Sequence, residues 1–170
     1  GIGAAIARAL AGIGLDLILT STKRGGTRAT AEACRAHGVE VLELAHDVGK
    51  RADADRVVAS ALKRFGEVDI LVNNAGIVIR RPVAKMSDDD FDRVLRVNLS
   101  GPFYLTRRLL PQMVRRGVGR IINVSSISAT LGSAGSSGYC ASKWGLDGFT
   151  RALAEETRGT GVLVCSVLPG

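Results

Sequence analysis

Short apolar runs of strand length alternate with segments of helical spacing along the whole chain, and this alternation limits the possible folds more than any other feature. The runs are rich in Leu, Val and Ile, and the segments between them repeat apolar residues every three or four positions. The expected strands are residues 15–20, 39–44, 68–72, 119–126 and 162–167. The expected helices are residues 2–12, 27–36, 47–65, 87–113 and 139–158. Such alternation is typical of βαβ units, so the sequence predicts an α/β fold with a doubly wound parallel sheet.

The composition agrees with a sheet that is covered on both faces. Hydrophobic residues make up 46% of the 170 residues but aromatic ones only 4%, so small aliphatic side chains dominate. Buried parallel strands between two helical layers have this character. The length suits one domain with a sizeable core, and we expect residues 1–170 to form a single domain.

The distribution of charge narrows the choice of partners. The formal net charge is +7, but the basic residues are scattered or paired, with no basic arm and little aromatic interleaving. This disfavours nucleic-acid binding and favours anionic ligands or acidic partners. No apolar run approaches the roughly 18 residues of a membrane span, and no signal peptide is evident, so no membrane association is expected.

The three cysteines, Cys34, Cys140 and Cys165, are odd in number and lack metal-ligand spacing. They indicate reduced thiols in a cytoplasmic protein without a metal site. Cys140 adjoins Tyr139, but nothing marks its thiolate as stabilised. We therefore interpret it as a small helix residue rather than a nucleophile.

Tyr139 and Lys143 are four residues apart, which places them on one face of the expected helix. A nearby ammonium favours the phenolate and lowers the pKa of a tyrosine from about 10, so such a tyrosine can exchange protons near neutral pH. Ser126 ends the preceding strand at its carboxyl end, where open α/β sheets bind ligands, and its hydroxyl could hold a substrate oxygen. By itself a Tyr/Lys pair at this spacing is far more often ordinary helix surface than a catalytic pair. The strand that ends in hydroxyls beside it favours a site.

Asn98 has a local reason to be functional. In an unbroken α-helix its carbonyl oxygen would accept from residue 102, but Pro102 has no N–H. The carbonyl is therefore expected to be free to hold a water molecule. The alternative is that Pro102 only kinks a long helix.

In this order along the chain, the motifs resemble those of the short-chain dehydrogenase/reductase family. They are Gly1-Ile2-Gly3, Asp47-Val48, Asn73-Asn74-Ala75-Gly76, Asn98, Ser126, Tyr139-x-x-x-Lys143 and Pro169-Gly170. Each motif alone is weak, but the set in this order is highly specific, and the resemblance spans the entire chain. It implies a Rossmann-like NAD(P)-binding domain that transfers hydride between a nicotinamide and a carbonyl or alcohol carbon.

The resemblance also implies the role of each catalytic residue. Tyr139 would be the acid/base, Ser126 would hold the substrate oxygen, and Lys143 would lower the pKa of Tyr139 and bind the nicotinamide ribose. Asn98 would hold a water that relays protons to Lys143. The implied cofactor-binding residues are Gly1, Ile2, Gly3, Ser21, Thr22, Asp47, Val48, Asn74, Ala75, Gly76, Tyr139, Lys143, Pro169 and Gly170.

Two of these motifs also have structural interpretations that remain open. Asp47 is a plausible N-cap for the helix that follows it, a role compatible with contact to an adenine. The turn at residues 73–76 could simply end a strand, although its small residues would let a ribose approach the backbone.

The expected cofactor is NADP(H) rather than NAD(H). Enzymes that prefer NAD usually place an acid after the second strand of this fold, where it bonds the ribose 2′-hydroxyl. The corresponding stretch, residues 20–24, contains Ser21, Thr22, Lys23 and Arg24 and no acid. A carboxylate would repel a 2′-phosphate, whereas hydroxyls and cations attract it.

Within the family, the motifs look most like those of 3-oxoacyl-[acyl-carrier-protein] reductases of fatty-acid synthesis. Arg115-Arg116 could help to dock an acidic carrier protein, or could be a solvated helix end whose cations complement the dipole. A sugar, steroid or small-ketone substrate stays open, as does a non-catalytic nucleotide-binding scaffold. The family also suggests a homotetramer or dimer.

The resemblance has a consequence for the sheet. In this fold a central strand precedes the glycine loop, and here the loop begins at Gly1. We therefore expect residues 1–170 to lack the first and last strands and to be a fragment of a longer chain of about 250 residues. The gap should fall between the strands at Leu17 and Ile70 and leave both with unpaired edges.

Overall fold

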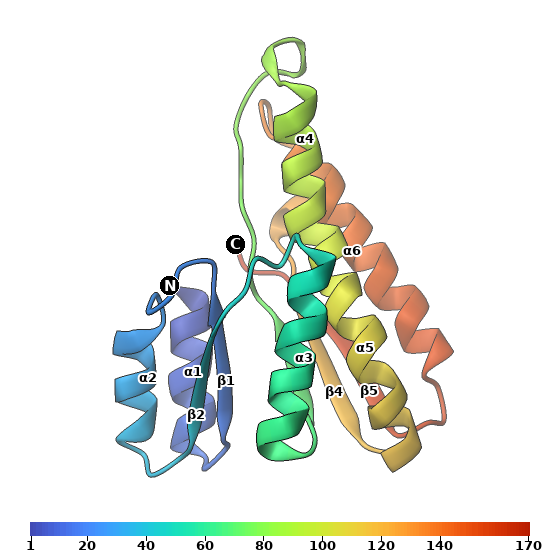
Figure 1. Ribbon diagram of the computed structural model, residues 1–170. Helices are drawn as coiled ribbons and strands as arrows, with labels where there is room; N and C mark the ends of the chain where they lie inside the picture. Colours follow the sequence, from blue (N-terminus) through green and yellow to red (C-terminus); the bar gives the residue numbers. More distant parts are fainter.

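The computed structural model describes residues 1–170 and contains two groups of parallel strands packed against helices (Figure 1). The helices are α1 (Ile2–Gly12), α2 (Arg28–Arg35), α3 (Arg51–Phe65), α4 (Asp88–Leu95), α5 (Gly101–Arg116) and α6 (Ser137–Glu156). The strands are β1 (Leu17–Ser21), β2 (Val41–Ala45), β3 (Ile70–Asn73), β4 (Gly119–Val124) and β5 (Val162–Val167). Short 3₁₀ helices, η1 (Val83–Lys85) and η3 (Ile127–Ala129), and a π-helical turn, η2 (Arg96–Ser100), complete the elements. No helix combines the length and apolar character needed to cross a membrane.

The parallel strands do not form one continuous sheet. β1 pairs with β2 in one sheet, and β3, β4 and β5 pair in that order in another. The break falls between β1 and β3, as the sequence predicts, and each strand presents an unpaired edge to it. The prediction of a doubly wound α/β fold is confirmed.

A cavity of about 820 Å³ runs between the two sheets. Its lining extends from Ser21 and Asn74, at the carboxyl ends of the strands, to Asp16 and Glu67 at the opposite ends. Aliphatic side chains of α1, α3 and α5 form much of the wall. We call this cavity the inter-sheet slot.

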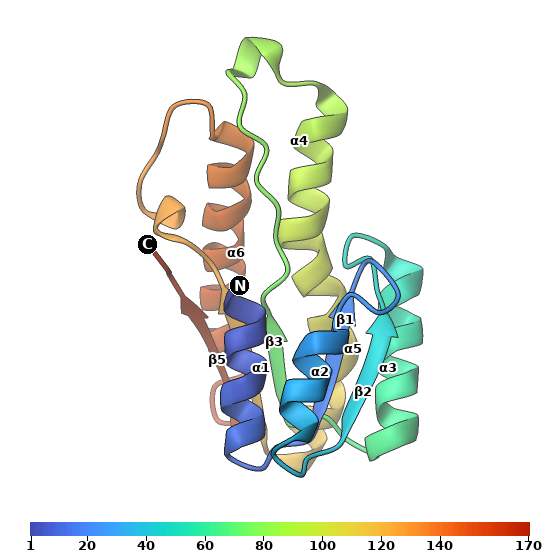
Figure 2. The ribbon, with the colours of Figure 1, turned by 90° about the vertical axis from the view of Figure 1, so that its left-hand side faces the viewer.

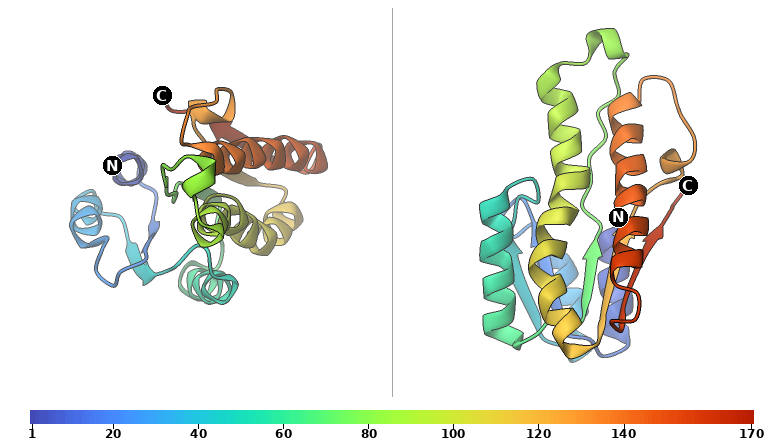
Figure 3. Two further views of the ribbon diagram at one scale, coloured as in Figure 1. Left: turned by 90° about the horizontal axis from the view of Figure 1, so that it is seen from above. Right: turned by 90° about the vertical axis from the view of Figure 1, so that its right-hand side faces the viewer.

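Two separate hydrophobic clusters lie on the two sides of the slot. The first joins α1, α2, β1 and β2 through Ala11, Leu17 and Cys34. The second joins α3, α5, α6 and the three-stranded sheet around Met113 and Ile121, both fully buried. Viewed from above in Figure 3, α1 and α2 stand apart from α3, α5 and α6. The core is therefore divided at the same place as the sheet.

A nearly continuous helix from α4 to α5 rises beyond the sheet, beside the extended segment that follows β3 (Figure 2). Ser87 caps its start by accepting from the amide of Asp90 at 3.2 Å. The helix widens into the π turn immediately before Pro102, where the proline removes a backbone donor. Val94 is fully buried, whereas Phe91 is 37% exposed and lies over Gly138.

The expected N-cap role of Asp47 is also wrong. α3 begins at Arg51, and Lys50 occupies the N-cap position. The carboxylate of Asp47 instead accepts from the amide of Gly49 at 3.1 Å in a local turn. The backbone amide of Asp47 donates to the carboxylate of Asp53 at 2.9 Å. A side chain in the first turn of α3 therefore caps the backbone of Asp47, whereas the side chain of Asp47 does not cap α3.

Candidate functional site

Lys143 is the most unusual charged side chain of the structure, because it is only 4% exposed. Its Nζ donates to the carbonyl oxygen of Val124, at the end of β4, at 2.8 Å. Burial lowers the pKa of Lys143 to about 8, so the group stays mostly protonated at neutral pH. Nζ lies 5.8 Å from the ring centroid of Tyr139, so α6 directs both side chains to one place.

Ser126 follows β4 and lies half-buried at the same end of the sheet. Its Oγ accepts from the amide of Ser128 at 3.1 Å, which leaves the hydroxyl proton free to be donated. The next amide, of Ile127, donates to the carbonyl oxygen of Pro169 at 2.9 Å. Pro169 and Gly170 therefore lie beside Ser126, although their sequence separation is large.

The side chain of Asn98 is fully buried and completely engaged. Its Oδ1 accepts from the amide of Ile77, and its Nδ2 donates to the carbonyl oxygen of Ile77, both at 2.8 Å. Nδ2 also donates to Oγ of Ser142 at 3.0 Å. We call these three bonds the Asn98 clamp. Sequence reasoning singled out the backbone carbonyl of Asn98 and missed its side chain.

The glycines predicted to bind the cofactor differ in how much space the surrounding residues leave for a side chain. A Cβ on Gly3 would lie 2.6 Å from Nδ2 of Asn74, so the start of α1 and the turn after β3 touch. A Cβ on Gly76 would lie 3.4 Å from Oδ1 of Asn98 and 3.6 Å from Nζ of Lys143. Gly1 meets no such neighbour. These positions form a surface without side chains beside a buried ammonium, which fits the sugar and phosphate groups of a dinucleotide.

The upper part of the inter-sheet slot collects half of the predicted cofactor-binding residues. Those that line it are Gly1, Ile2, Gly3, Ser21, Val48, Asn74 and Ala75. The slot does not include Asp47, Thr22, Gly76, Pro169, Gly170 or the four predicted catalytic residues. The candidate site therefore has two parts, a groove at the mouth of the slot and a cluster around Lys143, and Gly76 lies next to the second.

The end of β1 carries the predicted 2′-phosphate contacts. The hydroxyl of Ser21 donates to the carbonyl oxygen of Lys23 at 2.6 Å, so its proton is committed to the turn. Thr22, Lys23 and Arg24 are exposed. Of the two hydroxyls predicted to bind the 2′-phosphate, only that of Thr22 is therefore exposed and able to donate to it.

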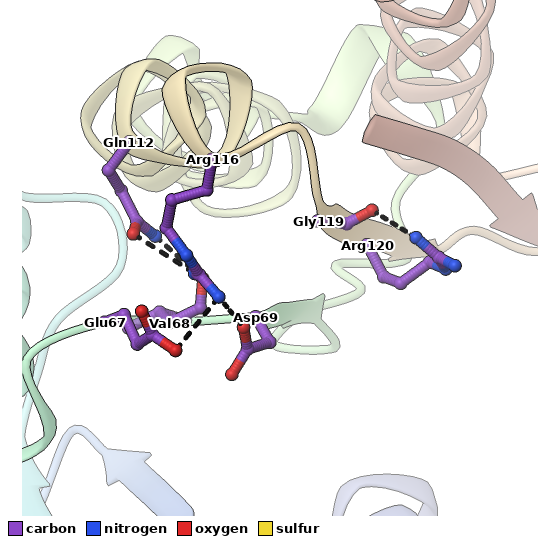
Figure 4. Close-up of polar contacts among 7 residues, drawn as sticks. All are labelled: Glu67, Val68, Asp69, Gln112, Arg116, Gly119 and Arg120. Atoms are coloured by element: carbon purple, nitrogen blue, oxygen red, sulfur yellow. Dashed lines mark hydrogen bonds and ion pairs between the residues drawn. The ribbon is translucent and has the colours of Figure 1, made fainter. Parts of the chain in front are cut away.

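Arg115 and Arg116, the predicted carrier-protein contacts, differ in their surroundings. Arg116 forms ion pairs with Glu67, at 3.0 Å, and with Asp69 (Figure 4). These bonds join the end of α5 to the segment before β3. Arg115 is exposed and belongs to no ion pair. Only Arg115 of this pair is therefore available to an outside partner.

Comparison with known proteins agrees with the geometry. A family model described as short chain dehydrogenase matches residues 1–170. The 3-oxoacyl-[acyl-carrier-protein] reductase FabG of Escherichia coli (strain K12) is 37% identical over 170 residues, which are 100% of this chain and 68% of that protein. The short-chain reductase protein NovJ of Streptomyces niveus is 41% identical over 100% of this chain and 64% of its own length.

A solved structure gives the same result. The crystal structure of a metagenomic short-chain oxidoreductase in complex with NADP superimposes with a TM-score of 0.96 and 37% sequence identity. The match covers 100% of this chain and 77% of that one.

Proposed function

Because the chain belongs to the short-chain dehydrogenase family of NAD(P)-dependent oxidoreductases, we propose that it reduces a 3-oxoacyl thioester with NADPH. The observation that carries the proposal is the buried ammonium of Lys143 beside the ring of Tyr139, with Ser126 at the same end of the sheet. Membership of this family shows that the protein is an oxidoreductase. The substrate and the preference for NADP(H) are what we propose.

In this proposal each residue of the cluster handles the substrate oxygen or its proton. The hydroxyl of Ser126 donates a hydrogen bond to the substrate carbonyl, because its oxygen already accepts from Ser128 and its proton is free. The phenol of Tyr139 gives its proton to the same oxygen during reduction. The positive charge of Lys143 then stabilises the phenolate that remains. A bound nicotinamide supplies the hydride.

The proposed cofactor surface uses the two parts of the candidate site. Gly1 and Gly3 leave room for a pyrophosphate at the start of α1, where backbone amides favour anions. Asp47 and Val48 would hold the adenine, and Asn74, Ala75 and Gly76 would hold the ribose groups near Lys143. Pro169 and Gly170 complete the surface on the side of Ser126.

NADPH is preferred over NADH because the end of β1 offers an attractive surface to a 2′-phosphate. Thr22, Lys23 and Arg24 are exposed there, and no acidic residue lies in the stretch. We expect a lower KM for NADPH than for NADH. A lower KM for NADH would refute this preference.

A 3-oxoacyl thioester is proposed because the E. coli relative, named a 3-oxoacyl-[acyl-carrier-protein] reductase, is 37% identical over the whole of this chain. Arg115 is the exposed cation available for an acidic carrier, since Arg116 is held by Glu67 and Asp69. Assembly into a homo-oligomer through α5 and α6 is part of the proposal; Phe103 and Trp144 are exposed on these helices.

The deciding experiment compares the wild-type enzyme with Tyr139→Phe on acetoacetyl thioesters, simple ketones and sugars. We expect the thioester to be the best substrate and the variant to lose turnover while still binding NADPH. Tyr104→Phe, on α5, is the matched control and should keep full activity. Turnover of Tyr139→Phe within a few-fold of wild type would contradict the role of Tyr139, and a sugar or ketone preferred over the thioester would contradict the substrate.

A further inference from the structure

The hydroxyl of Ser142 links two parts of the candidate site that are far apart in the sequence. Ser142 lies on α6 between Tyr139 and Lys143, and its side chain is fully buried. Its Oγ donates to the carbonyl oxygen of Tyr139 at 2.7 Å and accepts from Nδ2 of Asn98 at 3.0 Å. The first bond stays within one turn of α6, whereas the second reaches the π turn. The hydroxyl therefore connects the helical turn of Tyr139 and Lys143 to the Asn98 clamp.

Both donor hydrogens of the Asn98 side chain are used within the Asn98 clamp, so the bond to Ser142 has no substitute. A side-chain amide has two N–H donors. One hydrogen of Nδ2 of Asn98 goes to the carbonyl oxygen of Ile77, and the other goes to Ser142. If the hydroxyl of Ser142 is removed, one donor is left without a partner at a fully buried position, a costly arrangement. The amide of Asn98 would then be free to turn away from Ile77.

A buried hydroxyl can be satisfied by the carbonyl oxygens of the preceding helical turn alone, as that of Thr157, after the end of α6, is by Leu153 and Ala154. Two buried hydroxyls on α6 also accept a bond from an asparagine of another element. Thr150 accepts from Nδ2 of Asn123 at 2.8 Å, and Ser142 accepts from Nδ2 of Asn98. That second bond crosses to another element, so local helix geometry does not account for it.

The bond between Ser142 and Asn98 lies next to the ammonium of Lys143, so it can affect the reaction. Gly76 precedes Ile77, and a Cβ on Gly76 would contact both Oδ1 of Asn98 and Nζ of Lys143. The clamp thus fixes one wall of the space around the ammonium, and α6 fixes the ammonium itself. We propose that Ser142 is a positioning residue that holds the Tyr139–Lys143 turn in register with the segment at Gly76 and Ile77. This inference rests on the proposed function for its effect on turnover.

The test compares Ser142→Ala and Ser142→Cys with a buried-hydroxyl control in the native enzyme. Thr106→Val is the control, because the hydroxyl of Thr106 is buried and has no hydrogen-bond partner. We expect kcat to fall about tenfold in Ser142→Ala, with KM for NADPH within about twofold of wild type. Ser142→Cys keeps nearly the same side-chain volume and a weak donor and acceptor, so its kcat should lie between those of Ser142→Ala and the wild type. Thr106→Val should match wild type.

A second measurement needs neither cofactor nor substrate. The amide of Ile77 is held by Oδ1 of Asn98, so its hydrogen exchange reports the clamp directly. We expect exchange about tenfold faster in Ser142→Ala and unchanged in Thr106→Val. This readout separates failure of the inference from failure of the proposed function, because it does not depend on the reaction.

A double-mutant cycle shows whether Ser142 acts through Asn98. Asn98→Asp removes the donor that reaches Ser142, so adding Ser142→Ala to it should cause little further loss of kcat. Wild-type kcat in Ser142→Ala, wild-type exchange at Ile77, or fully additive effects in the double variant would each overturn the proposal. If Ser142→Ala does not fold, the same outcomes are judged on Ser142→Cys.

Discussion

At the scale of single residues, His46 makes the fold sensitive to acid. Its imidazole is 2% exposed and neither ring nitrogen has a hydrogen-bond partner. Burial is the main cause that lowers the pKa of His46 below its ordinary value of 6.5, partly opposed by Asp53 and Asp47 and reinforced by Arg56. The unfolded chain therefore binds a proton at higher pH than the folded one. The stability that depends on a neutral His46 is fully present above pH 6.5 and is lost as the pH falls below it.

The free energy of unfolding of the wild type should fall between pH 6.5 and 5, and we expect this fall to be smaller in His46→Leu. Protonation of one histidine can change the free energy of unfolding by at most about 1.4 kcal/mol per pH unit. The measurement is urea denaturation of the native enzyme at several pH values. His37→Gln is the control, because His37 is exposed and its replacement should leave the slope unchanged. An identical slope in wild type and His46→Leu would contradict this account.

At the scale of elements, the π turn depends on Pro102. Pro102→Ala restores an N–H that can bond the carbonyl oxygen of Asn98 in regular α-helical geometry. The turn would then tighten and pull Asn98 away from Ile77. We expect kcat to fall about tenfold while the melting temperature stays equal or rises. Pro111→Ala, inside α5 and away from the turn, is the matched control; equal kcat in both variants would show that the turn does not depend on Pro102.

The elements also show what the sequence can and cannot predict. The strands were placed within about two residues, because buried runs such as Val162–Val167 carry their signal locally. Asp47 was misplaced because its carboxylate bonds a nearer amide, at Gly49, than those of α3. The Asn98 clamp was missed because bonds between residues 21 and 44 positions apart leave no trace in local spacing.

At the scale of the whole molecule, the inter-sheet slot limits stability. β1 and β3 each have one unpaired edge, and the walls of the slot are largely apolar. Full burial of an apolar side chain contributes about 1.5–3 kcal/mol, so leaving several side chains exposed along the slot costs an amount comparable to the total stability of a domain. We expect residues 1–170, expressed as a separate polypeptide, to lack a single cooperative melt and tight NADPH binding. Calorimetry and fluorescence titration test this, and a sharp melt with tight binding would contradict it.

The same division sets an order of events on the ribosome. The cluster of α1, α2, β1 and β2 is complete once residue 45 has emerged, whereas β5 appears only near residue 167. At about 5–20 residues per second, roughly 6 to 24 s separate the two events. Throughout that interval the slot-facing side chains of α1 and β1 form one wall of the slot before β3 and α5 form the other. Chaperone contact during synthesis should therefore concentrate on the apolar side chains of α1 and β1 until α5 has emerged.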